Sequence, residues 1–257
     1  MLYIVKEVMI KDEQWNSNYT SQELNLENNE LHIWRTKVSE LLNNLDSYWK
    51  ILNIEEQKHA NSFNFTKDRN RYIIARSVLR ILLEKYLKNI KKEELLFDRT
   101  KYGKPYLCDL INLHNIKFNL SHSYDYIVYA FTKNNNVGVD IEFINRDIVI
   151  EDIIENSCSE QEKLLLNDLN KDDKCNTFYK FWVIKEAIVK AMGVGMSFDL
   201  RCISVNLGKN KLIDAFSIVN NSKLYWTVEL VYAYNSCCSA FATRNPIGRV
   251  FFLTYQD

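Results

Sequence analysis

Apolar residues recur at helical spacing in a long central segment of the chain. Over residues 68–88, one stripe occupies positions i, i+4, i+7 and i+8, with the members Ile74, Val78, Ile81 and Leu82. The same spacing recurs over residues 177–192, where Gly193 and Gly195 then act as stop signals. We therefore predict two long amphipathic helices, and a further acidic helical stretch over residues 151–173.

Shorter segments alternate between apolar and polar residues, which is the pattern of strands with one buried face. We expect strands at residues 1–10, 31–38, 118–123, 126–132, 137–143, 202–207, 213–219, 224–235 and 238–243. Residues 134–136 are three asparagines that predict a hairpin-like turn, and the end of the chain around Pro246 predicts a tail. The order of strand, helix and strands occurs before about residue 133 and again after about residue 137, which suggests two similar halves, residues 1–137 and 138–257.

Composition narrows the class of protein. The 257 residues are 47% hydrophobic and 26% charged with a net charge of zero, which excludes a disordered chain. Two prolines and six glycines leave no material for a flexible linker. The six cysteines form no CxxC pair, so we expect no zinc site and no disulfide framework. With no signal-like start and no long apolar run, we expect a cytoplasmic protein that has no membrane segment.

Two carboxylates on one predicted strand are the first candidates for chemistry. Asp140 and Glu142 stand two residues apart and share one face, opposite Val139 and Ile141. Neighbouring like charges repel unless a cation lies between them, and hard oxygen ligands suit Mg²⁺. The alternative is an ordinary exposed edge of a strand, which is the commoner role of surface acids.

A mixed face on the second long helix adds to these candidates. Trp182, Lys185, Glu186, Val189 and Lys190 follow at i, i+3, i+4, i+7 and i+8. One interpretation is a third carboxylate and two cations directed at a metal and phosphate centre. The other is an ordinary Glu–Lys pair on a helix surface.

Three arginines and one histidine are weaker candidates. Arg69, Arg76 and Arg80 lie one above the next on the first long helix, as either a phosphate-binding ridge or a solvated face. His122 follows Ser121 near a predicted turn, where a single histidine is more often structural. No GxSxG, GxxxxGK[ST] or GxGxxG motif is present, so a serine hydrolase and common nucleotide-binding loops are not indicated.

Four motifs in order resemble the Sfp-type 4′-phosphopantetheinyl transferases: YGKP at 102–105, FNLSHS at 118–123, GVDIE at 138–142 and FWVIKEAIVKAMGVG at 181–195. The resemblance covers roughly residues 55–235. It implies transfer of the 4′-phosphopantetheine arm of coenzyme A to a serine of an apo carrier protein (peptidyl, acyl or aryl), with adenosine 3′,5′-bisphosphate leaving. It also implies an α+β fold of two α/β halves related by a pseudo-twofold axis, with the active site at their junction.

The resemblance assigns roles residue by residue. Asp140, Glu142 and Glu186 would hold Mg²⁺, for which Mn²⁺ could substitute, and Glu186 would also serve as, or position, the base for the carrier serine. Lys185 and Lys190 would stabilise the pyrophosphate of coenzyme A. Lys104 would contact the phosphates, and Ser121 and His122 would lie near the 3′-phosphate.

One segment departs from the family pattern. Glu56 and His59 stand where lysines are common, and Tyr72 stands where relatives carry a small hydroxyl residue. A Mg²⁺-dependent nuclease or nucleotidyl transferase is the alternative function, and a non-catalytic carrier-binding protein is a third. With a net charge of zero we expect no nucleic acid as partner, and with both halves in one chain we expect a monomer.

Overall fold

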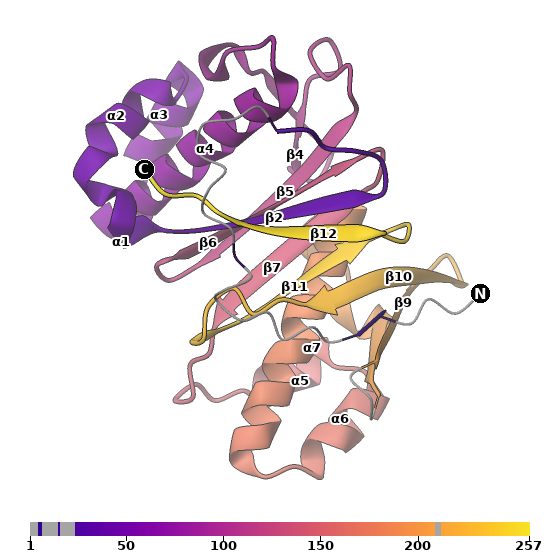
Figure 1. Ribbon diagram of the computed structural model, residues 1–257. Coiled ribbons are helices and arrows are strands. Elements are labelled where there is room, and N and C mark those ends of the chain that lie inside the picture. Colours follow the sequence, from indigo (N-terminus) through magenta and orange to yellow (C-terminus); the bar gives the residue numbers. More distant parts are fainter. Residues whose placement is uncertain (1–4, 7–14, 16–23, 209–211) are drawn as a thin grey trace.

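The structure is a computed structural model, and it describes residues 5–6, 15, 24–208 and 212–257. The fold is α+β, as expected. Two sheets face each other, and each carries helices on its outer face (Figure 1). In the described part of the chain no helix has the length and apolarity that crossing a membrane requires.

The first sheet has the strand order β12-β2-β6-β5. Its strands are β2 (Glu30–Lys37), β5 (Ile116–Ser123), β6 (Tyr126–Lys133) and β12 (Arg249–Thr254). The helices that accompany it are α1 (Val38–Leu41), η2 (Leu42–Asn44), α2 (Leu45–Ile51), α3 (Ile54–Asn61), α4 (Thr66–Leu87) and η3 (Lys92–Glu94). A separate small ribbon pairs β3 (Phe97–Arg99) with β4 (Pro105–Leu107).

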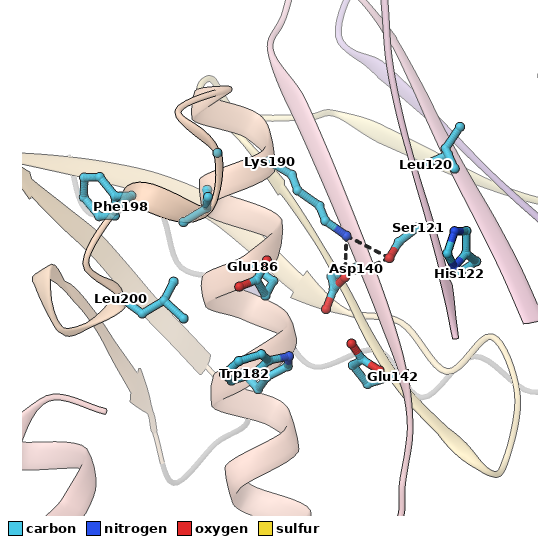
Figure 2. Close-up of a pocket in the computed structure, with 12 residues that line it drawn as sticks. Leu120, Ser121, His122, Asp140, Glu142, Trp182, Glu186, Lys190, Phe198 and Leu200 are labelled. Atoms are coloured by element: carbon cyan, nitrogen blue, oxygen red, sulfur yellow. Dashed lines mark hydrogen bonds and ion pairs between the residues drawn. The ribbon is translucent and has the colours of Figure 1, made fainter. Parts of the chain in front are cut away.

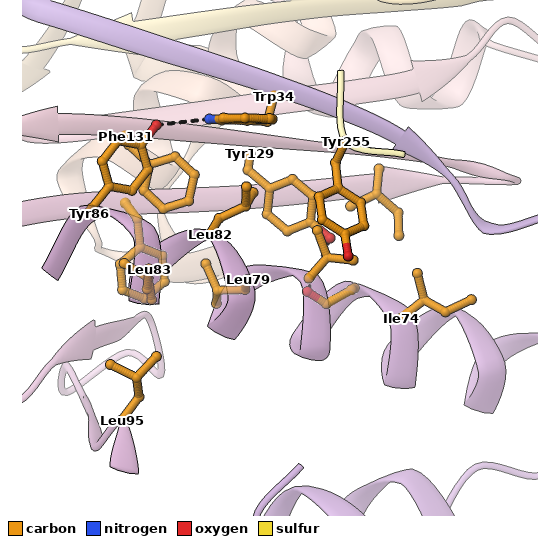
Figure 3. Packing of buried hydrophobic residues seen from close by; sticks show 14 of the residues in the cluster. Trp34, Ile74, Leu79, Leu82, Leu83, Tyr86, Leu95, Tyr129, Phe131 and Tyr255 are labelled. Atoms are coloured by element: carbon orange, nitrogen blue, oxygen red, sulfur yellow. Dashed lines mark hydrogen bonds between the residues drawn. The ribbon is translucent and has the colours of Figure 1, made fainter. Parts of the chain in front are cut away.

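Helix α4 confirms the first long helix and explains its apolar stripe. Ile74, Leu79 and Leu82 are fully buried and pack against the sheet (Figure 3). The hydroxyl of Tyr86 receives a hydrogen bond from Trp34 Nε1 at 2.8 Å, which satisfies two polar groups inside this core. Burial of apolar side chains in such a core is the main favourable contribution to the stability of a folded domain.

The second sheet has the order β1-β9-β10-β11-β7, with β8 paired to β9. Its strands are β1 (Val5–Lys6), β7 (Val137–Phe143), β8 (Ile203–Leu207), β9 (Leu212–Val219), β10 (Ser222–Leu230) and β11 (Cys237–Thr243). Its helices are α5 (Glu151–Ser157), α6 (Glu160–Asn167), α7 (Lys171–Met192), η4 (Gly195–Ser197) and η5 (Leu200–Cys202). Gly193 ends α7 in the left-handed conformation with φ 70°, which confirms the predicted stop.

An apolar layer joins the two sheets. Ile33 and Val128 enter it from the first sheet, and Val139 and Ile141 enter it from the second. The alternation predicted for residues 137–143 is therefore correct: the apolar side chains of β7 face the other sheet. Asp140 and Glu142 face the opposite way, toward α7 and the edge of β5.

The acidic stretch 151–173 is helical as predicted, and it holds α5, α6 and the start of α7. Two other expectations about elements were wrong. The asparagines at 134–136 form no hairpin, because β6 and β7 belong to different sheets. The chain end forms β12, which runs parallel to β2 and so returns to the first sheet. Of residues 1–10, Val5 and Lys6 pair with β9, and the others lie outside the described residues.

Candidate active site

A cavity of about 470 Å³ lies where β5 of the first sheet meets β7 and α7 of the second. Figure 2 shows that α7 forms one wall, β5 and β7 form the other, and the segment after α7 closes one side. The lining residues are Leu120, Ser121, His122, Asp140, Glu142, Trp182, Glu186, Val189, Lys190, Gly195, Phe198 and Leu200. The cavity thus brings together six of the eight predicted site residues.

Side chains of β5 and backbone groups of β7 join the two edge strands. Asn119 Oδ1 accepts a hydrogen bond from Val139 N at 2.9 Å, and Ser123 Oγ accepts one from Phe143 N at 3.0 Å. These bonds satisfy N–H groups that an edge strand would otherwise leave unpaired. The positions 119, 121 and 123 share one strand face, so the period of the FNLSHS motif could have indicated Asn119 and Ser123 as residues that hold the site together.

Asp140 is the centre of the cavity. Its side chain is 3% exposed, and its Oδ1 lies 2.6 Å from Lys190 Nζ and accepts a hydrogen bond from Ser121 Oγ at 2.8 Å. The ammonium of Lys190 also donates to Ser121 Oγ at 2.8 Å, which closes a triangle of three polar groups (Figure 2). Asp140 Oδ2 is buried and has no hydrogen-bond partner in the described part of the protein. Such an orphaned carboxylate oxygen is costly unless a ligand satisfies it.

Glu142 and Glu186 line the same cavity as Asp140 and interact with it electrostatically. Burial raises the pKa of both glutamates above the usual value, and the negative charge of Asp140 raises it further. Lys190 opposes this increase in both cases, and Ser123 Oγ opposes it at Glu142 by donating a 2.8 Å hydrogen bond. The three carboxylates therefore repel one another electrostatically, as the ligands of a shared cation do when the cation is absent.

The donor set fits a hard divalent cation. Among the described residues no group of three His, Cys, Asp or Glu side chains is already arranged as a metal site. At Asp140 the ammonium of Lys190 neutralises Oδ1. The orphaned Oδ2 and the mutual repulsion of three carboxylates nevertheless match the oxygen-rich ligands that Mg²⁺ prefers.

His122 lines the cavity beside Ser121. Desolvation lowers the pKa of its imidazole, and the positive charges of Arg71 and Lys190 act in the same direction. An anion bound beside the ring would have the opposite effect. Arg71, which no motif in the sequence indicated, is thus a second positive group near this end of the cavity.

Lys185 does not face the cavity, which corrects the expectation that it shares a face with Glu186. Its side chain is 1% exposed, and its Nζ lies 2.6 Å from Glu162 Oε2. Neighbouring residues on a helix point about 100° apart, so Glu186 and Lys185 face different surroundings. The other residues selected by the helical spacing, Trp182, Glu186, Val189 and Lys190, do line the cavity, and Lys185 does not.

Lys104 binds backbone carbonyls of two elements, and it does not line the cavity. Its Nζ donates to Val137 O at 2.9 Å and to Lys190 O at 2.5 Å, which ties β7 to the last turn of α7. Burial lowers the pKa of this amine to about 8, and the charges of Lys117 and Lys190 add to the effect. These two bonds hold Lys104 beside the cavity without placing it in the lining.

The arginine ridge on α4 is not a free phosphate site. Glu56 binds Arg76 through Nη2 at 2.8 Å and Arg80 through Nε at 2.8 Å, and Arg80 is fully buried. The arginine spacing therefore reflects a buried ion-pair network for two of the three residues. Glu56, the departure noted above, is the carboxylate that holds this network together.

The other two departures pack together. His59 lies 4.8 Å from Tyr72 between ring centroids, and Phe63 completes the cluster at 5.3 and 5.5 Å. Arg69 lies over the ring of Trp49 at 4.9 Å. This part of the first half is thus aromatic where the family pattern is basic.

Comparisons with known proteins identify a family for this chain. A family model described as the 4′-phosphopantetheinyl transferase superfamily matches residues 136–242, and a model of the N-terminal part of 4′-phosphopantetheinyl transferase matches residues 32–134. The 4′-phosphopantetheinyl transferase HetI of Nostoc sp. is 30% identical over 174 residues, which cover 68% of this chain and 73% of HetI.

Two further relatives extend the match. The 4′-phosphopantetheinyl transferase gsp of Aneurinibacillus migulanus is 30% identical over 196 residues, 74% of this chain and 78% of the relative. The L-aminoadipate-semialdehyde dehydrogenase-phosphopantetheinyl transferase of Rattus norvegicus is 32% identical over 219 residues, 79% of this chain and 71% of the relative. Because family models match both halves and these relatives match over most of their length, the chain belongs to the 4′-phosphopantetheinyl transferase superfamily.

Proposed function

We propose that the cavity between β5, β7 and α7 transfers the 4′-phosphopantetheine arm of coenzyme A to a serine of an apo carrier protein. The carrier would be a peptidyl, acyl or aryl carrier domain. The observation that carries the proposal is the buried triangle of Asp140, Lys190 and Ser121 with an orphaned carboxylate oxygen, flanked by two glutamates of raised pKa. An ammonium and a hydroxyl beside a cluster of carboxylates suit a substrate that contains a pyrophosphate, because charged donors form strong hydrogen bonds with phosphate oxygens.

Binding would depend on groups that line the cavity. Lys190 would exchange part of its contact with Asp140 for a phosphate oxygen, and Ser121 Oγ lies beside it as a further donor. His122 would bind near the 3′-phosphate, since a phosphate favours the protonated imidazole. Trp182, Phe198 and Leu200 give the opposite wall an apolar surface on which the pantetheine arm could lie.

Asp140, Glu142 and Glu186 would hold Mg²⁺, with Mn²⁺ as a substitute. The ion would supply charge neutralisation on the pyrophosphate, which is the principal requirement of a phosphoryl-type displacement. The repulsion among the three carboxylates would then be relieved. Removing Lys190 from Asp140 would free Oδ1 for the same purpose.

The transfer itself requires one bond to form and one to break. The oxygen of the carrier serine forms a bond to the phosphorus next to the pantetheine arm, and the bond from that phosphorus to adenosine 3′,5′-bisphosphate breaks. The serine loses its proton, which Glu186 would accept directly or through a water. Glu186 lines the cavity from α7, which supports this role for it as a general base.

The same reasoning supports two proposals about how the protein works. We propose a monomer, because one chain supplies both walls of the cavity. We also propose action in a reducing compartment such as the cytoplasm, because all six cysteines are free thiols.

Incubation of the protein with coenzyme A, Mg²⁺ and an apo carrier protein tests the function. Intact-mass spectrometry should show that the carrier gains one phosphopantetheine group. A carrier in which the acceptor serine is replaced by alanine serves as the control and should gain nothing. An unmodified carrier after long incubation with several carrier classes would contradict the proposal.

A further inference from the structure

The strongest polar network outside the cavity surrounds Lys185. Its ammonium uses all three donors: it pairs with Glu162 Oε2 at 2.6 Å, and it donates to Ser157 O at 2.7 Å and to Leu200 O at 3.1 Å. The side chain is 1% exposed, so these three partners replace its whole hydration shell. A buried lysine with every donor satisfied has a fixed position.

Glu162 is satisfied in the same way. Its side chain is 2% exposed, its Oε1 accepts from Val205 N at 2.8 Å, and its Oε2 accepts from Ser159 N at 2.8 Å. The ion pair therefore joins α7 to the end of α5, to the start of α6, to β8 and to the segment at Leu200. These five segments meet at two buried charges.

The segment at Leu200 is one wall of the cavity. Leu200, whose carbonyl accepts from Lys185, lines the cavity together with Phe198, while Trp182, Glu186 and Lys190 line it from α7 (Figure 2). Lys185 is part of α7 and is adjacent to Glu186 in the chain. Its bond to Leu200 O thus sets how far this wall lies from the helix that carries the carboxylate.

We propose that Lys185 is a positioning residue for the transferase reaction: its buried ammonium holds the wall formed by Phe198 and Leu200 at the distance from α7 that coenzyme A requires. Stability alone does not explain a lysine here. A buried ion pair is often no more stabilising than apolar side chains of similar volume, but an apolar side chain offers no directional donor for the carbonyl of Leu200. The lysine therefore fixes the position of the Leu200 backbone relative to α7.

A double-mutant cycle tests the inference, with Lys185→Met and Leu200→Ala made singly and together. The kinetic part rests on the proposed function, so the affinity for coenzyme A is measured by titration calorimetry beside the rate of carrier modification. Lys185→Met should weaken the affinity and kcat/KM for coenzyme A by about tenfold or more, because small displacements of a binding wall are costly. If the lysine acts through the wall, the double variant should lose little more affinity and kcat/KM for coenzyme A than Leu200→Ala loses alone.

The control is Lys174→Met, the same substitution on the same helix. Lys174 pairs with Glu151 at 3.7 Å, and that glutamate is 63% exposed, so affinity and rate should stay at the wild-type level. Additive losses in the cycle would overturn the proposal, because Lys185 would then act independently of the wall. Wild-type affinity and rate in folded Lys185→Met would reduce the lysine to a purely structural role and would also overturn it.

Two further readouts keep the test informative. Should Lys185→Met not fold, Glu162→Gln removes the charge partner while leaving the two carbonyls to hold the lysine, and a smaller loss of affinity with the same dependence on Leu200 is expected. Hydrogen exchange of residues 198–205 should quicken in either variant, and unchanged exchange would contradict the proposal even if the wild-type protein fails to modify any carrier. A wild-type protein that binds coenzyme A without transfer would contradict the proposed function while leaving this inference testable through affinity.

Discussion

Replacing Gly138 by alanine should disturb both stability and activity, because β7 lies directly on α7 at this position. A Cβ atom at residue 138 would lie 2.0 Å from Ala187 O and 2.4 Å from Ala191 N. Both are backbone atoms of a helix and cannot turn aside. Ordinary contacts at such a carbon are 3.4 Å or longer, so relieving the two clashes requires the strand and the helix to separate by about 1–1.4 Å.

The expected magnitude follows from this overlap. Inserting one methyl group into a packed interior typically costs about 1–3 kcal/mol, and two backbone clashes place Gly138→Ala at or above the upper end. Separation would also strain the contact between Asp140 and Lys190 at 2.6 Å and the bonds of Lys104 across the same interface. A displacement of about 1 Å at a reacting centre can reduce turnover about a hundredfold.

Urea unfolding and steady-state carrier modification measure the two effects. Gly103→Ala is a matched control, because a Cβ there meets nothing within 4 Å although its φ is +86°. It should lose only about 1 kcal/mol of stability from backbone strain and keep its turnover. A Gly138→Ala variant whose stability and rate stay close to wild type would refute the packing argument.

Three further predictions concern single side chains. Lys190→Met should reduce kcat/KM for coenzyme A about a hundredfold or more, and a rate within threefold of wild type in steady-state assays would remove Lys190 from phosphate binding. His122→Ala should shrink the preference for coenzyme A over dephospho-coenzyme A, and an equal ratio of kcat/KM values in wild type and variant would contradict the 3′-phosphate role. Burial lowers the pKa of His32 to about 4 from 6.5, so its contribution to stability is present above pH 6.5 and is lost as pH falls toward 4. His32→Gln should therefore lose less stability than wild type between pH 7 and pH 4.5 in urea unfolding, by up to about 3 kcal/mol, and parallel losses would refute the assignment.

The helices and inner strands were predictable because one face of each is buried. Periodicity located α4, α7 and β7, and Gly193 located the end of α7. The same alternation correctly placed Asp140 and Glu142 on one face. Local pattern is informative wherever burial is one-sided.

Pairing between distant segments was not predictable from local pattern. Strand β12 follows the Pro246 turn and pairs with β2, more than two hundred residues earlier in the chain, and nothing near residue 250 identifies that partner. The hairpin expected at 134–136 failed for the same reason, since a turn signal does not say which sheet the next strand joins.

Burial of charged residues was the other limit. Lys185 and Arg80 have the spacing of exposed functional residues, but each is neutralised inside the protein by a glutamate from another helix, Glu162 and Glu56. Charge on a helix predicts solvent or ligand until a partner elsewhere in the fold is known. The partner glutamates stand at helix starts, three residues after Asn53 and Ser159, and that local signal does not identify the arginine or the lysine with which each pairs.

Asp140→Asn tests whether the buried carboxylate cluster at Asp140 performs the proposed transfer. The substitution keeps the size of the side chain and its hydrogen bond with Ser121, and removes the charge that faces Lys190. Single-turnover modification of an apo carrier, followed by intact mass at saturating coenzyme A and Mg²⁺, should slow about a hundredfold or more while the far-ultraviolet circular dichroism of the variant matches wild type. A folded Asp140→Asn protein that modifies the carrier at the wild-type rate would contradict the account.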